Sequence, residues 1–179
     1  SLKPLKGFIY NNYCEGSGSG RNYFTDSNGQ KCDAIRTFLE EAHSSGEMSD
    51  AEYFYYLASL LNSIDKYANT ASVYAAFLKH IKKSAAKDFT LSLLPVLSGQ
   101  AGKVYNKDVN DLITKINGDI LYLDPPYNAR QYSANYHILE TIAKYDNPAL
   151  RGITGLRDYE QQKSRFCSKR TASAALDTL

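Results

Sequence analysis

Apolar residues recur at helical spacing through the first half of the chain. Positions 34, 35, 38, 39 and 42 predict a helix that ends near His43. Ser49–Glu52 has the sequence of a capping box, and apolar positions 54, 57, 61 and 64 follow it. Positions 73, 77 and 81 indicate a third helix. We therefore expect a helical region over about residues 30–87. Before it, the Gly-rich and Asn-rich stretch 7–29 predicts a loop, with one short strand at Phe8–Tyr10.

Beyond Pro95 the periodicity changes. Residues 103–108 indicate a strand and residues 109–116 a short helix, and the apolar run in 119–124 is typical of a strand covered on both faces. Strand, helix and strand form a βαβ unit, which predicts part of a Rossmann-like parallel sheet. Ser133 is expected to cap a further helix that stops before Asp146.

Composition narrows the class of protein without deciding it. The 179 residues are 43% hydrophobic and 22% charged, in the ordinary globular range, and no apolar run is long enough to cross a bilayer. Three scattered cysteines give neither a disulfide framework nor a metal half-site, so we expect a cytoplasmic protein. A net charge of +2 does not by itself indicate nucleic acid. The sequence does not begin with Met, so we expect a piece of a longer protein.

The tetrapeptide Asp124-Pro125-Pro126-Tyr127 directly follows the predicted buried strand. Each proline holds the residue before it extended and offers no N–H, so the segment is a rigid ledge that presents the Asp124 carboxylate and the Pro125 carbonyl. Two acceptors followed by an aromatic ring suit a planar ligand that bears an amino group. They would take both hydrogens of that group and direct its lone pair toward an electrophile. The alternative is a stiff turn with only a capping role.

Residues 120–137, which contain this ledge, resemble the DPPY region of adenine-specific DNA methyltransferases of restriction–modification systems, in the group related to the Dam-type enzymes. Residues 21–29, 68–74 and 164–169 are similar to the same group, so the resemblance covers most of the chain. It implies a methyl group passing from S-adenosylmethionine to N6 of an adenine flipped out of double-stranded DNA.

The resemblance also implies roles for individual residues. Asp124 and the Pro125 carbonyl would bind the amine, and Tyr127 would stack on the adenine. Asp108 and Val109 would lie beside the adenine ring of the cofactor. For Asp108 a helix N-cap is an equally good and compatible interpretation. Glu15–Gly20 resembles the ExGxGxG pattern of a cofactor loop, but the turn sequence over 26–29 and a helix beginning only near residue 30 disfavour that use, so we expect a flexible loop near DNA.

Basic residues suggest where DNA would lie. Lys79, Lys82, Lys83 and Lys87 fall at the end of the third predicted helix, where they would follow a phosphate backbone or simply complement the helix dipole. Arg130 and Gln131 follow the ledge and would contact phosphates, contact the orphaned partner base or fix the loop. No pattern of His, Cys or acidic residues suggests a metal site, and the reaction needs none.

We therefore expect an α/β fold, a partial Rossmann-like methyltransferase sheet with a largely α-helical insert. Residues 1–95 would be the insert and candidate DNA-recognition region, and residues 96–179 the partial core. The expected partners are double-stranded DNA and a cognate restriction endonuclease for the same site, with no membrane. Two alternatives stay open: methylation of an exocyclic amine in RNA, and a DNA-recognition fragment without catalysis.

Overall fold

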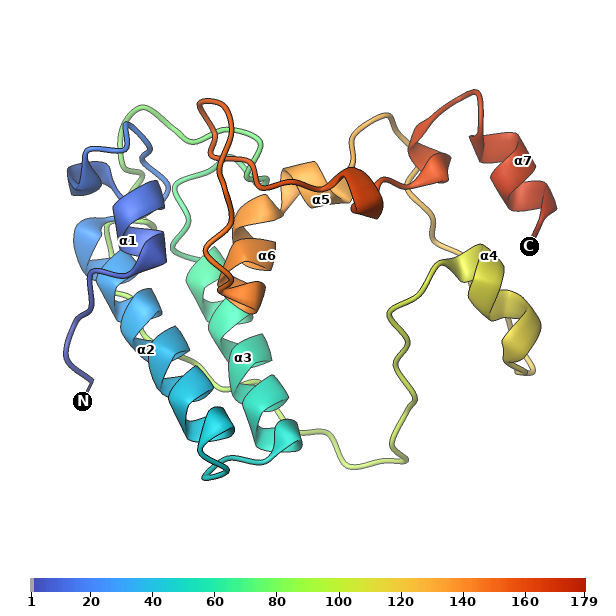
Figure 1. Cartoon of the computed structure of the whole chain (residues 1–179), viewed down its shortest axis with the longest axis horizontal. Helices are drawn as coiled ribbons and strands as arrows, with labels where there is room; N and C mark the ends of the chain where they lie inside the picture. Colours follow the sequence, from blue (N-terminus) through green and yellow to red (C-terminus); the bar gives the residue numbers. More distant parts are fainter. Residues whose placement is uncertain (1) are drawn as a thin grey trace. The chain divides into compact units, whose positions relative to one another are not determined.

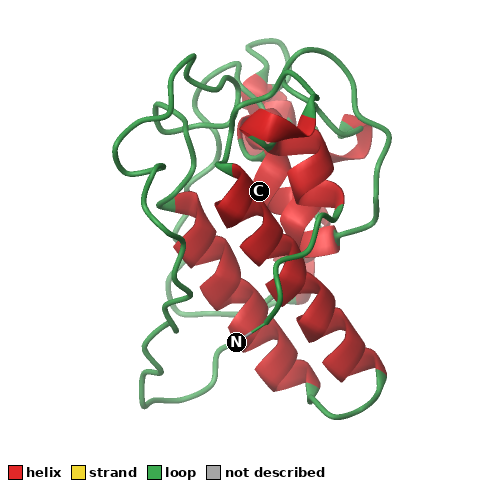
Figure 2. Cartoon of the chain, turned by 90° about the vertical axis from the view of Figure 1, so that its left-hand side faces the viewer, coloured by secondary structure: helices red, strands yellow, loops and turns green. Residues whose placement is uncertain are grey.

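A computed structural model describes residues 2–179, and within them the regular structure is helical. Figure 2 shows helices and loops. The described residues form no strand and only two isolated β-bridges, which pair Cys14 with Phe24 and Arg151 with Leu156. The prediction of a Rossmann-like sheet is therefore wrong for this chain. The chain divides into two compact units, the first made of residues up to Pro95 together with Ala134–Asp158, the second of Val96–Ser133 and Tyr159–Leu179.

A helical hairpin forms the framework of the first unit. Helices α2 (Asp26–Ser44) and α3 (Asp50–Asp65) pack side by side, as their apolar periodicity predicts (Figure 1). Helix α2 begins at Asp26, so the predicted turn over 26–29 is wrong. The Thr25 side chain accepts a hydrogen bond from the Asn28 N–H and caps the helix. A Cβ at Gly29 would collide with the Cys14 sulfur, so only glycine allows this first turn to pack there.

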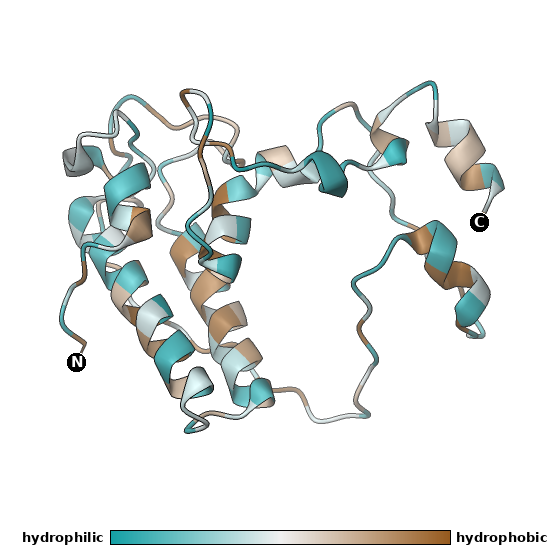
Figure 3. Ribbon diagram, viewed as in Figure 1, coloured by the Kyte–Doolittle hydropathy of each residue, from teal (hydrophilic) through white to brown (hydrophobic). Residues whose placement is uncertain are grey.

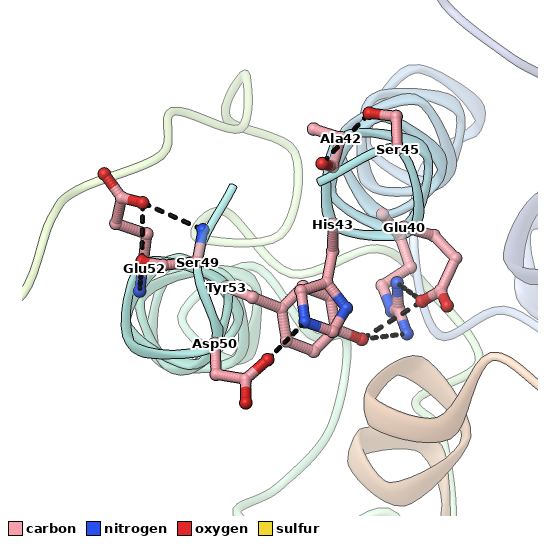
Figure 4. A network of polar contacts seen from close by, with 9 residues as sticks. Glu40, Ala42, His43, Ser45, Ser49, Asp50, Glu52 and Tyr53 are labelled. Carbon is pink, nitrogen blue, oxygen red and sulfur yellow. Dashed lines mark hydrogen bonds and ion pairs between the residues drawn. The ribbon is translucent and has the colours of Figure 1, made fainter. Parts of the chain in front are cut away.

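Polar contacts fix the link between α2 and α3 (Figure 4). The capping box is confirmed, because the Ser49 side chain accepts from the Glu52 N–H while the Glu52 carboxylate accepts from the Ser49 N–H. The His43 ring stacks on Tyr53 with centroids 4.3 Å apart, and its Nε2 lies 2.7 Å from the Asp50 carboxylate. The orientation of the hairpin is thus set by side chains at its closed end.

Helix α1 (Phe8–Tyr13) occupies the place of the predicted strand at Phe8–Tyr10, which is wrong. The cause is a buried carboxylate on α2. Asp33 accepts hydrogen bonds from the backbone N–H groups of Gly7, Ile9 and Tyr10 at 2.8–3.0 Å, which satisfies donors that the start of a helix leaves free. A short 3-10 turn, η1 (Glu15–Ser17), follows α1.

The third predicted helix, over residues 73–81, is absent. Residues 66–95 run as turns and extended chain. Ser72 has a φ of 109°, a conformation that a helix cannot contain. Tyr74 is fully buried, and its hydroxyl donates to Asp65 at 2.7 Å. The apolar spacing therefore did not indicate a helix here, because Phe77 packs against the core from a loop.

The helix predicted from Ser133 is present as two pieces, α5 (Tyr132–Asn135) and α6 (His137–Lys144). Helix α6 packs on α3, and both helices carry apolar residues where they lie together (Figure 3). The buried Arg36 guanidinium joins them, since it donates to the carbonyls of Ile142 at 3.0 Å and Ala143 at 3.1 Å, and to the Tyr53 hydroxyl at 2.7 Å. Tyr145 then ends α6 in the left-handed conformation.

The second unit holds short helical pieces and extended chain. Its elements are α4 (Val109–Leu112), the 3-10 turns η2 (Ile113–Lys115), η3 (Glu160–Gln162) and η4 (Arg165–Cys167), and α7 (Ala172–Asp177). Helical structure over 109–115 matches the prediction. The strands predicted over 103–108 and 119–124 are wrong. Ile120 is 90% exposed, and the apolar run has no neighbouring strand among the described residues to complete a ladder or to cover its faces.

Candidate functional site

The ledge lies open to solvent in the second unit. Asp124 is exposed, Pro125 and Pro126 are half-buried, and the Tyr127 ring is 87% exposed. The chain turns directly after it, where the Asn128 side chain accepts from the Arg130 N–H at 2.9 Å. A carboxylate, a proline carbonyl and an accessible ring therefore follow one another along an extended stretch, which leaves all three available to a planar ligand.

The residues that follow the ledge are hydrogen-bonded to a segment more than thirty positions later in the sequence. The Gln131 amide forms a reciprocal pair with the backbone of Ser164: its Nε2 group donates to the carbonyl at 3.3 Å, and its Oε1 accepts from the N–H at 2.8 Å. The Cys167 thiol donates to the Arg130 carbonyl at 3.4 Å. Gln131 is thus engaged with protein backbone, whereas the Arg130 side chain is exposed. This arrangement favours the loop-fixing interpretation of Gln131 over a contact with DNA.

Asp108 caps α4, as the capping interpretation predicts. Its carboxylate accepts from the Asn110 N–H at 2.9 Å. The Asn110 side chain accepts from Arg165 at 3.0 Å and donates to the Ala175 carbonyl at 2.8 Å. Residues 164–178 therefore contact both the helix that starts beside Asp108 and the segment that follows the ledge.

The residues assigned to the cofactor do not form a complete site for it. Asp108 is exposed and Val109 only half-buried, and the carboxylate is already bonded to its own helix. A ligand of the size of S-adenosylmethionine usually has most of its surface covered by its pocket. These two residues alone do not enclose such a ligand.

The four lysines lie on a loop of the first unit. Lys79, Lys83 and Lys87 are exposed, but Lys82 is half-buried and its ammonium donates to the Thr70 carbonyl at 2.7 Å. The interpretation in which these charges complement a helix dipole is wrong, because no helix ends here.

Glu15–Gly20 forms η1 and a turn with positive φ at Gly18 and Gly20. No helix starts at Gly20, and the Gly16 N–H instead donates to Asp26 at 2.7 Å. The geometry of a glycine cofactor loop that leads directly into a helix is therefore missing from this part of the described chain.

Sequence reasoning missed the residues that hold these loops. They are asparagines and a serine, namely Asn22, Asn28, Asn69 and Ser164. Asn28 and Asn69 are fully buried. No clear signal for them is present in the sequence, because a buried asparagine has to satisfy its amide and only the fold shows that it is buried and with which partner it bonds.

The structure supports neither a metal site nor a membrane-spanning helix among the described residues. Within residues 2–179, no group of His, Cys, Asp and Glu is placed to hold a metal ion. Among the same residues, none of the helices combines the length and apolar character needed to span a bilayer.

A family model for the D12 class of N6 adenine-specific DNA methyltransferases matches residues 4–178. The chain belongs to this family. The match confirms the resemblance drawn from the ledge and the three flanking stretches, and membership in a methyltransferase family implies a methyl donor.

Curated relatives of this D12-class chain are named as type II methyltransferases or modification methylases. It is 54% identical over 171 residues to the type II methyltransferase M.NlaIII of Neisseria lactamica, which covers 94% of this chain and 50% of that protein. It is 42% identical over 173 residues to M.FokI of Planomicrobium okeanokoites, covering 96% and 27% respectively. The modification methylase LlaI of Lactococcus lactis subsp. lactis is 45% identical over 154 residues, covering 84% and 24%. The chain therefore spans about half or less of the length of these relatives. No solved structure matches it.

Proposed function

We propose that the protein transfers a methyl group from S-adenosylmethionine to N6 of an adenine in double-stranded DNA, and that this chain supplies the group that holds the adenine. The observation that carries the proposal is the exposed Asp124-Pro125-Pro126-Tyr127 ledge in a chain that belongs to the D12 class. Its relatives named as type II methyltransferases support a role in a restriction–modification system, acting in the cytoplasm beside a cognate endonuclease.

The ledge suits an aromatic amine. The N6 lone pair is delocalised into the adenine ring and is a weak nucleophile. Hydrogen bonds from the amine to the Asp124 carboxylate and the Pro125 carbonyl would localise that pair as the new N–C bond forms. Pro125 and Pro126 keep the two acceptors in place because their φ angles are fixed. Tyr127 would stack on the flipped base.

The remaining assignments concern the cofactor and the DNA backbone. We assign Asp108 and Val109 to one edge of the cofactor site, with most of that site formed by other parts of the protein. We assign Lys79, Lys83 and Lys87 to phosphate contacts, and Arg130 to the DNA near the target base. The polar groups of Lys82 and Gln131 form hydrogen bonds with the protein backbone, so these two residues would hold the contacting loops in place.

Methyl incorporation by the full-length protein tests the proposal. The wild-type protein should methylate duplex DNA and leave structured RNA unmodified. Asp124→Ala should lower the rate by about 10²–10³, the usual effect of removing one preorganised polar group that stabilises a transition state. Because Asp124 is exposed, we expect the variant to fold normally. Asp119→Ala, an exposed aspartate in the same segment, is the matched control and should retain the wild-type rate.

Three results would contradict the proposal. A rate for Asp124→Ala within tenfold of wild type would remove the ledge from catalysis. Preferential methylation of RNA would transfer the activity to the RNA alternative. Binding of DNA by the full-length protein without any methyl transfer would favour the DNA-recognition alternative.

A further inference from the structure

Three asparagine side chains hold the loop that carries the lysines. We define residues 78–89 as the basic loop; it contains no regular structure and is drawn in green in Figure 1. Asn22 donates to the carbonyls of Leu78 and Lys79, the latter at 3.2 Å. Asn69 donates to the Leu78 carbonyl at 3.0 Å and accepts from the Lys82 N–H at 2.9 Å. The first part of the loop is thus bonded to side chains outside it.

Asn28 holds the second part. Its NH2 group donates to the carbonyls of Ala85 at 3.2 Å and Lys87 at 2.9 Å, and its oxygen accepts from the Phe89 N–H at 2.8 Å. Asn28 and Asn69 are fully buried, so their amides have no access to water as an alternative partner. The loop therefore has a defined backbone although it lacks a helix.

The lysines of the basic loop fall into two groups. The Lys82 ammonium donates to the Thr70 carbonyl at 2.7 Å and points back into the protein. Lys79, Lys83 and Lys87 are exposed, and none of them forms an ion pair within residues 2–179. Phosphate binding needs accessible ammonium groups on a backbone that is held in place, and only the second group offers them.

We propose that Asn22, Asn28, Asn69 and Lys82 are positioning residues that set the basic loop before DNA arrives, so that Lys79, Lys83 and Lys87 meet phosphates of the duplex. This rests on the proposed function for the identity of the polyanion. Ordering a flexible loop during binding costs affinity, and a loop that is ordered beforehand avoids that cost. The asparagines act through backbone geometry and touch no phosphate themselves.

The test uses the full-length protein and a DNA duplex, with the dissociation constant measured over a series of salt concentrations. Lys83→Ala and Lys87→Ala should each reduce the slope of log K against log salt by about 0.9, the value for one lost phosphate contact. Lys82→Ala should leave that slope unchanged, although it removes the same charge. Lys3→Ala, an exposed lysine outside the loop, controls for charge alone and should match wild type.

The positioning residues are tested by substitutions that do not change charge. Asn28→Ala and Asn69→Ala should weaken DNA binding about tenfold and speed amide hydrogen exchange across residues 78–89. Asn62→Ala, an exposed asparagine on α3, should change neither quantity. If either buried-asparagine variant fails to fold, Lys82→Ala still decides, because among the lysine variants only Lys82→Ala is expected to combine faster exchange in the loop with an unchanged salt slope.

Two results would overturn the inference: an equal loss of slope for Lys82→Ala and Lys83→Ala, or wild-type affinity and exchange in Asn28→Ala and Asn69→Ala. If the wild-type protein methylates DNA and the loop variants bind DNA with normal affinity, the loop's role is refuted and the proposed function is unaffected. A wild-type protein that neither methylates nor binds DNA would refute both.

Discussion

At the scale of single residues, His137 is a titratable group buried in the first unit. Its side chain is fully buried, and its two ring nitrogens each lie 3.0 Å from a carbonyl oxygen, those of Ala134 and Thr154. A neutral ring donates to only one of them. Burial lowers the pKa of His137 below its ordinary 6.5, while the two carbonyls oppose that shift.

We therefore expect stability to fall in mild acid. Below pH 6.5 the unfolded chain binds a proton that the folded protein resists, so the free energy of unfolding is greatest above pH 6.5 and decreases as the pH drops toward the lower folded pKa of His137. The slope is at most about 1.4 kcal/mol per pH unit for one proton. Denaturant titrations of wild type and His137→Gln between pH 5 and 7 would check this. An equal slope in both proteins would exclude His137 as the cause.

Tyr127 permits a prediction about the ledge. The ring is exposed, and the proposed stacking on a base requires the ring rather than the hydroxyl. Tyr127→Phe should keep methyl transfer close to wild type in the full-length protein, whereas Tyr127→Ala should lose the stacking free energy of about 1–3 kcal/mol. Fluorescence of 2-aminopurine at the target position would report whether the base still flips. Equal damage from Phe and Ala would mean that the hydroxyl takes part in the chemistry.

At the scale of elements, apolar periodicity predicted a helix correctly where the capping signals are also local in the sequence. Helix α3 has its capping box and its apolar stripe, and both are visible in the sequence around Ser49–Glu52. Helix α1 was not predictable from local pattern, because its first N–H groups bond to Asp33, more than twenty residues away. The same holds for residues 73–81, where the Leu78 carbonyl bonds to Asn69, a buried asparagine outside the segment, rather than within a helix.

The ledge was identified from sequence because its rigidity is local, since two prolines fix it without help from the rest of the fold. Its support was hidden, because the pairing of Gln131 with Ser164 joins residues 33 positions apart. The strands beside it were predicted from an apolar run alone. An apolar run indicates that a segment has to be buried. It does not indicate that the described residues include the neighbouring strands or helices that would bury it.

Arg36 permits a prediction at this scale, because it joins α2, α3 and α6. Its planar guanidinium donates to two carbonyls at the end of α6 and to the Tyr53 hydroxyl, and the Tyr53 and Tyr145 rings lie 5.5 and 5.4 Å from it. Arg36→Lys keeps the charge but loses this fork of donors, so we expect the free energy of unfolding to fall by about 2–4 kcal/mol. Chemical denaturation measures it. Lys31→Arg, on the same helix and half-buried, is the control for a basic exchange.

At the scale of the whole molecule, the 179 residues alone should bind S-adenosylmethionine weakly and show no turnover. The reason is that Asp108 is exposed and Val109 only half-buried, so the residues assigned to the cofactor do not enclose a ligand of that size. Isothermal titration of the isolated chain, with the full-length protein as control, would check this. Micromolar binding by the isolated chain would show that a complete cofactor site lies within it and would return Glu15–Gly20 to consideration.

The first unit is assembled from two stretches of chain separated by residues 96–133. Ile138 and Ile142, both fully buried in its core, belong to the later stretch. On the ribosome, α1, α2 and α3 therefore emerge well before the residues that complete their apolar packing. The hairpin has to wait with an open apolar face until α6 has been synthesised, and during that interval the nascent chain is most exposed to aggregation and to chaperone binding.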